Sequence, residues 1–168
     1  PQSGEYVLRW VSNWEAKIAL AQREPQRAEK LLESLVDLED SGLLFGTRSA
    51  QWLHVQAAFD QGSLSVAARR FETYSARPDE SEDPLHRALE TSLRAQLALA
   101  HGSLEEAVLH AQSANEQLRD LGEFVSSIQV GLVWVQALEM GGHLKHARSV
   151  LEQRLAALTS HLPKIPAS

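Results

Sequence analysis

Two histidines near the end of the chain come closest to a metal-binding pattern. His143 and His146 are three residues apart, and His110 is the only histidine in the corresponding earlier segment 104–121. A zinc site needs three or four ligands, and no third ligand accompanies this pair at a fixed spacing. We therefore expect these histidines on a solvated helix face, with neither a metal ion nor another cofactor.

Signatures of catalysis are missing from the sequence. It contains no HExxH pattern, no phosphate-binding glycine loop and no GxSxG turn. The absence of cysteine excludes a thiol nucleophile and disulfides. Carboxylate pairs such as Glu39-Asp40 and Glu105-Glu106 fall at helix ends or in loops, where the helix dipole and solvation account for them. We therefore expect a protein that is not an enzyme.

Glutamines recur at a regular spacing that suits ligand binding. Gln56, Gln96 and Gln136 follow one another at a constant interval, and Lys17 holds the corresponding place before Gln56. Amide groups can orient a polar ligand through hydrogen bonds. The same spacing also allows a ladder of hydrogen bonds between the glutamines, so both interpretations stay open.

Four tryptophans could add a stacking surface. Burial in the core is the common fate of this side chain, and we expect it for Trp14 and Trp134. Trp10 and Trp52 are expected instead to face a ligand, because an indole supplies apolar area beside orienting amides.

An internal repeat sets the spacing of all these residues. Turns with glycine, then leucine two positions later and alanine five positions later, recur at Gly62, Gly102 and Gly142. Glycine permits the left-handed backbone that ends a helix, and alanine permits close approach of the next helix. A weaker copy, Arg23-Glu24-Pro25 followed by Ala28, precedes the first at nearly the same interval. Four helical hairpins are therefore predicted.

The apolar period on both sides of each turn is close to that of an α-helix and predicts an all-α chain. We expect helices at residues 4–22, 25–39, 45–61, 64–76, 84–101, 104–121, 123–141 and 144–158. The four repeats cover approximately residues 4–42, 43–82, 83–122 and 123–161, within a single domain over residues 1–161. The acidic segment 77–84 is expected to be the most mobile connection, and residues 162–168 a linker.

The turn pattern resembles the tetratricopeptide consensus, most clearly in Gly102-Ser103-Leu104-Glu105-Glu106-Ala107. It departs in its longer period, about 40 residues, and in Ala58, Ala98 and Leu138, which stand where an aromatic is usual. A period of this length is similar to that of the superhelical sensor domain of MalT-like, large ATP-dependent LuxR-type transcription activators. The resemblance implies a right-handed α-superhelix of four antiparallel hairpins, flanked in such proteins by a nucleotide-binding switch domain and a helix-turn-helix.

In such repeats the first helices line the concave face, and the resemblance implies that this face binds. The side chains expected there are Trp10, Asn13, Lys17, Trp52, Gln56, Ser92, Gln96 and Gln136.

The resemblance also implies the role of this binding face. A polar effector or peptide bound there would bias self-association of a bacterial transcription regulator. Partners would be such an effector, another protein, the chain's own flanking domains or a second copy. The alternative is a scaffold that holds a partner peptide or helix, with no link to transcription.

Composition narrows the partners. Sixteen basic and 22 acidic residues give a net charge of −6, without a basic stripe, so we expect no direct contact with nucleic acid. The most apolar stretch, residues 128–140, contains Gln129, Gln136 and Glu139 and is too short for a membrane span. With the absence of cysteine, these features favour the cytoplasm. The chain opens at Pro1 without a leader, from which we expect a piece of a longer polypeptide.

Overall fold

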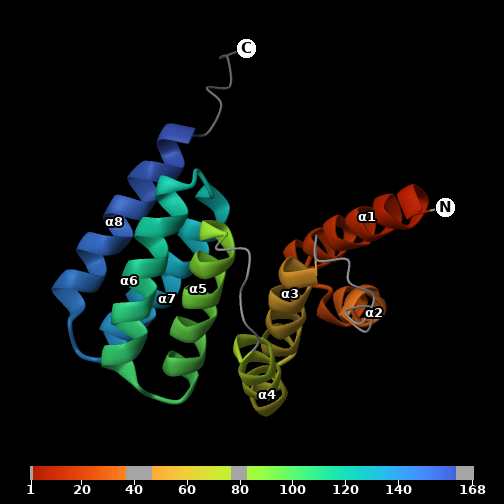
Figure 1. Ribbon diagram of the computed structural model, residues 1–168. Coiled ribbons are helices and arrows are strands. Elements are labelled where there is room, and N and C mark those ends of the chain that lie inside the picture. Colours follow the sequence, from red (N-terminus) through yellow and green to blue (C-terminus); the bar gives the residue numbers. More distant parts are fainter. Residues whose placement is uncertain (1, 37–46, 77–82, 162–168) are drawn as a thin grey trace. The chain divides into compact units, whose positions relative to one another are not determined.

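The computed structural model describes residues 2–36, 47–76 and 83–161, and within these ranges the chain forms α-helices and no strand (Figure 1). The all-α prediction is confirmed. The helices are α1 (Gln2–Ala21), α2 (Pro25–Val36), α3 (Thr47–Asp60), α4 (Leu64–Ser75), α5 (Pro84–Ala100), α6 (Leu104–Asp120), α7 (Phe124–Met140) and α8 (Leu144–His161). No end differs from its predicted place by more than three residues. The predicted linker at 162–168 and most of the predicted mobile connection at 77–84 lie outside the described residues.

The chain divides into two compact units, Pro1–His86 and Arg87–Ser168, and the division falls within the first turn of α5. In the first unit α1 packs on α2, α2 on α3 and α3 on α4, and α1 also contacts α3. That last contact places the first helices of two successive hairpins side by side. In the second unit α6 packs on α7 and α7 on α8. The predicted superhelix concerns both units together and stays a prediction.

Five turns between described helices share one hydrogen-bonding pattern. In the turn after α5, the N–H of Gly102 donates to the carbonyl of Leu99 at 3.0 Å, and the N–H of Ser103 donates to that of Ala98 at 2.9 Å. These two bonds define the Schellman motif, which satisfies carbonyls left open at a helix end. Its left-handed position is occupied by Arg23 (φ 62°), Gly62 (74°), Gly102 (77°), Gly122 (75°) and Gly142 (79°).

The turn at Gly122 joins two hairpins and is not part of the predicted repeat pattern. Its bonds, from Gly122 to Arg119 and from Glu123 to Leu118, match those of the turns inside hairpins. The turn glycines of the second unit are consequently evenly spaced, at positions 102, 122 and 142. The helices α5, α6 and α7 each have 17 residues, which corresponds to a length of about 25 Å. In the second unit α5, α6 and α7 are therefore helices of equal length, and each is followed by the same turn.

A small residue stands five positions after each of these left-handed residues. It is at most 2% exposed in all five cases, and the members of the series are Ala28, Ala67, Ala107, Ser127 and Ala147. Ser127 fits this series because its hydroxyl donates to the carbonyl of Phe124 at 2.8 Å and so needs no other partner. The turn thus delivers a small side chain to the point where the next helix begins to pack. The predicted role of alanine in the repeat agrees with this burial.

Arg23 is the one non-glycine residue at the left-handed position of these five turns, and replacing it with glycine should stabilise the protein. A side chain in the left-handed region costs about 1–2 kcal/mol, part of which glycine gives back as chain entropy in the unfolded state. We expect Arg23→Gly to raise the free energy of unfolding by about 0.5–1 kcal/mol in urea denaturation. The matched control is Gly62→Ala, since an added Cβ there meets no atom within 4 Å. It should lower stability through backbone strain alone. A destabilised Arg23→Gly or a stabilised Gly62→Ala would contradict the shared turn geometry.

The buried alanine at the start of α6 tests the packing. Ala107 is fully buried, whereas Ala156 on α8 is exposed. We expect Ala107→Leu to lower the free energy of unfolding by roughly 1–3 kcal/mol, because the added atoms overpack the contact between helices. Ala156→Leu adds the same atoms and should leave stability nearly unchanged. Equal effects of the two changes in thermal denaturation would show that the alanine position carries no packing constraint.

Candidate functional site

The residues predicted for the binding face lie on four helices in two units. Trp10, Asn13 and Lys17 are on α1 with Trp52 and Gln56 on α3, all in the first unit; Ser92 and Gln96 on α5 and Gln136 on α7 are in the second. The α1 and α3 residues lie close to one another, since Asn13 Nδ2 on α1 donates a hydrogen bond to Ser49 Oγ on α3 at 3.2 Å.

Trp52 is buried and does not face a ligand groove. Its side chain is 4% exposed, and its ring lies 5.8 Å from that of Phe71 on α4. The cause is the central place of α3, which packs on both α2 and α4 and keeps little of its surface free. The expected exposure of this indole is thereby corrected, because the residue fills the interface between helices.

The glutamine register, by contrast, stays on the outside of its helices. Gln56 is half-buried and donates from Nε2 to Asp60 Oδ1 at 2.8 Å, one turn further along α3. Lys17 and Gln96 are also half-buried, and Gln136 is exposed. Binding of a ligand at these positions stays a prediction. The proposed glutamine ladder would join residues of both units and stays a prediction.

Two tryptophans form an exposed aromatic pair on α1. Trp10 is 60% and Trp14 48% exposed, and their ring centroids are 5.9 Å apart at an interplanar angle of 65°. The Lys17 ammonium lies 4.8 Å from the centroid of the Trp14 ring, within the range of a cation–π contact. The two indoles and the cation make a surface that combines apolar area with one positive charge.

The position of Trp14 departs from the expectation that it is a core residue. The core of the first unit is reached from α1 through Ala16 and Ala19, which are fully buried. Large side chains occupy the opposite side of the same helix, because small ones are needed where α1 meets its neighbours. Trp134 on α7 is buried, as expected.

The aromatic pair belongs to a longer apolar stripe, which we name the α1 outer face. It consists of the exposed residues Val7, Trp10, Val11, Trp14 and Ile18. Their spacing of three and four positions places them on one side of the helix. Contiguous exposed apolar surface of this kind is characteristic of interaction sites, whereas single exposed apolar residues are ordinary. The spacing of apolar residues in α1 contains this signal, although Trp14 is predicted to lie in the core.

A partly buried polar network joins three helices of the first unit, and the sequence did not reveal it. The carboxylate of Glu29 on α2 accepts hydrogen bonds from Arg70 on α4 and from Gln61, which follows α3. Arg70 also donates to the carbonyl of His54 at 3.0 Å. The ring of His54 lies with Nδ1 3.0 Å from the Tyr74 hydroxyl and Nε2 3.8 Å from Glu29. The network thus connects α2, α3 and α4 through side chains.

The side chains around Glu29 stabilise its negative charge. Burial by itself raises the pKa of the carboxyl, but the hydrogen bonds from Arg70 and Gln61 and the nearby positive charge outweigh it, so the pKa is lowered from 4.5. The ion pair is therefore kept over the whole neutral range of pH.

The histidines of α8 take part in a different contact. His146 is exposed, and its ring meets that of Trp134 edge to face with centroids 5.8 Å apart. Within the described ranges, no three side chains of histidine, aspartate or glutamate gather in a way that could hold a metal ion. Nor does any helix in these ranges combine the length and apolarity that a membrane span requires.

No family model, curated protein or solved structure matches this chain. Its function has to be inferred from the geometry of its own surfaces.

The network around Glu29 predicts a dependence of stability on pH. A carboxyl with a lowered pKa in the folded state stabilises the fold above its unfolded value, and that contribution is lost as the pH falls below about 4.5 through the folded pKa. We expect Glu29→Gln to lower the free energy of unfolding at pH 7 by roughly 1–3 kcal/mol, since it removes the negative charge that pairs with the Arg70 guanidinium. The loss should shrink at pH 3.

The control for this change is Glu33→Gln, on the exposed side of the same helix. Urea denaturation of both variants at pH 7 and pH 3 gives the comparison. The same pH dependence in wild type and Glu29→Gln, judged against Glu33→Gln, would contradict the stabilising role of the ion pair.

Proposed function

We propose that this chain is a helical-repeat binding module and that its α1 outer face docks an amphipathic helix of a protein partner. The observation that carries the proposal is the exposure of the Trp10 and Trp14 indoles on an otherwise apolar stripe. Tryptophan is among the residues that contribute most to binding at protein interfaces when water is excluded from it. Covering an apolar surface of this kind with a partner is favourable in free energy, because it removes the surface from water.

The shape of the surface favours a helix as the bound element. Side chains at spacings of three and four positions form a ridge along α1, and such a ridge packs into the groove of another helix. Lys17 lies at the side of the ridge, where an acidic residue of the partner could pair with its ammonium. The partner segment is thus apolar on one side and carries a carboxylate beside that side.

The resemblance noted in the sequence supports a more specific proposal. In this proposal the repeats form a right-handed superhelix in the cytoplasm, and they act as the sensing and self-association module of a bacterial transcription regulator. The outward register of Lys17, Gln56, Gln96 and Gln136 would then contact a polar effector. The regular recurrence of the glycine turns supports it. A scaffold unrelated to transcription uses the same surfaces for a partner alone.

The full-length protein separates these two roles. A phosphate-binding loop before this segment and a helix-turn-helix after it would favour the regulator. Secretion, chaperone or enzyme domains in those places would favour the scaffold.

The α1 outer face can be tested without a known partner. We expect a phage-displayed library of helical peptides, selected on the purified chain and counter-selected on Trp10→Ala/Trp14→Ala, to yield apolar sequences with one flanking carboxylate. A selected peptide should bind the double variant at least tenfold more weakly in isothermal titration calorimetry.

The matched control is Leu109→Ala, which removes an exposed apolar side chain from α6 of the other unit. It should leave the affinity unchanged. Failure to select any peptide that distinguishes wild type from the double variant would argue against docking at α1.

A further inference from the structure

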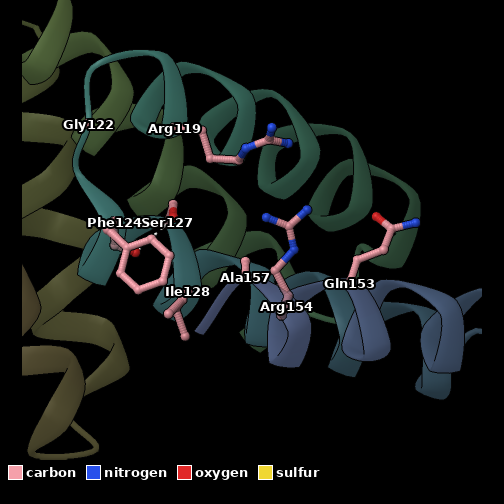
Figure 2. A pocket seen from close by; sticks show the side chains of 8 residues that line it. All are labelled: Arg119, Gly122, Phe124, Ser127, Ile128, Gln153, Arg154 and Ala157. Atoms are coloured by element: carbon pink, nitrogen blue, oxygen red, sulfur yellow. Dashed lines mark hydrogen bonds between the residues drawn. The ribbon is translucent and has the colours of Figure 1, made fainter. Parts of the chain in front are cut away.

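The second unit contains a cavity whose lining includes none of the residues predicted for the binding face. Its volume is about 410 Å³, and it is bounded by the end of α6, the beginning of α7 and the second half of α8 (Figure 2). The residues that line it are Arg119, Gly122, Phe124, Ser127, Ile128, Gln153, Arg154 and Ala157. A volume of this size lies within the range of pockets that bind small molecules.

Two arginines meet at this cavity without an acidic neighbour in its lining. Figure 2 shows the guanidinium of Arg154 pointing from α8 toward the part of α6 that carries Arg119. None of the lining residues is acidic, although the chain as a whole has a net charge of −6. Within the described part of the chain, neither guanidinium takes part in an ion pair. The charged side chains that line the cavity are therefore both positive, in a protein whose net charge is negative.

Arg154 is the more unusual of the two, because most of its side chain is buried. The residue is 9% exposed, and its Nε is inaccessible to solvent and has no hydrogen-bond partner among the described residues. Burial, followed by the like charge of Arg119, lowers the pKa of the Arg154 guanidinium. An arginine stays protonated even so, and a largely buried cation without an acidic partner is costly to the fold.

The backbone of α7 is shaped to hold this arginine. A Cβ on Gly131 would lie 3.0 Å from Arg154 Cδ and 3.3 Å from Cγ, closer than side-chain carbons normally approach. The absence of a side chain at Gly131 thus leaves room for the arginine stem to cross α7 and reach the cavity. The position of the guanidinium is fixed by packing and does not depend on a partner charge.

The remaining lining complements the charge. Phe124, Ile128 and Ala157 supply apolar wall, and Gln153 and Ser127 supply polar atoms. The first turn of α7 also borders the cavity, where the helix dipole favours negative charge. An anion with an apolar portion would satisfy both parts of this lining at once.

From this geometry we propose that the cavity is a binding site for a small organic anion, whose carboxylate or phosphate group pairs with Arg119 and Arg154 while its apolar portion contacts Phe124 and Ile128. Guanidinium groups bind both kinds of oxyanion through paired hydrogen bonds. This site is independent of docking at α1, which lies in the other unit.

Two probes distinguish the head groups. Phenyl phosphate and benzoate share a ring and differ in the anion, and inorganic phosphate carries the charge without apolar surface. We expect saturable 1:1 binding of phenyl phosphate or benzoate to the full chain in isothermal titration calorimetry. Amide resonances of Gly122, Ser127 and Gln153 should shift in NMR spectra of the titration. Inorganic phosphate should bind at least tenfold more weakly than the better ring probe.

Three variants assign the binding to the cavity. Arg154→Met keeps most of the stem volume and removes the charge, so it should abolish binding and raise the thermal stability of the free protein. Arg119→Gln changes an exposed side chain, is therefore safe for the fold, and should weaken binding at least tenfold. Arg148→Gln is the matched control, because it removes the same charge from the exposed side of α8, where Arg148 pairs with Glu152.

The results that would overturn the proposal are equally definite. Absence of saturable binding with both ring probes would do so, as would unchanged affinity in Arg119→Gln or Arg154→Met. Inorganic phosphate binding as tightly as the ring probes would show charge attraction only. A loss of affinity in Arg148→Gln equal to that in Arg119→Gln would show the same.

Discussion

Carbonyl groups at the end of a helix have no partner in the helix itself, and in this chain a single left-handed residue resolves that problem at each of five described turns. Its N–H and the N–H that follows return to carbonyls three and five positions back, which closes the helix and reverses the chain within a short turn. Arg23, Gly62, Gly102, Gly122 and Gly142 all occupy this conformation. The length of each of these connections, and thus which helix faces meet, depends on it.

The turn also decides where large side chains can lie. Because a small residue follows five positions later, the beginning of the next helix can approach its neighbour closely. On α1, which precedes the first of these turns, the small residues Ala16 and Ala19 likewise reach the core, whereas Trp10 and Trp14 lie outside on the opposite side. On α7 the small residues Ser127 and Gly131 lie one turn apart, and the room at Gly131 admits the stem of Arg154. Both surfaces proposed for binding thus follow from close approach of helices elsewhere.

Local signals in the sequence predict the elements well and the exposure of single residues poorly. Glycine turns and apolar periodicity located the helix ends to within three residues, since both act over a few neighbouring positions. Trp52 and Trp14 exchanged their expected environments, because burial depends on how many helices surround a given one. The ion pair of Glu29 and Arg70 joins α2 to α4, and the cavity at Arg154 is lined by residues of three helices. Neither feature corresponds to a local spacing of residues, so the sequence did not predict them.

The equal spacing of turns in the second unit has a consequence for how such a chain can change in length. Each segment of one helix and one turn reverses the direction of the backbone. Gain of a single segment would exchange the ends at which all later helices begin, and would bring their outward faces to the other side. Gain of two segments restores direction and register together. An insertion or deletion therefore preserves the existing surfaces only when it adds or removes an even number of helices.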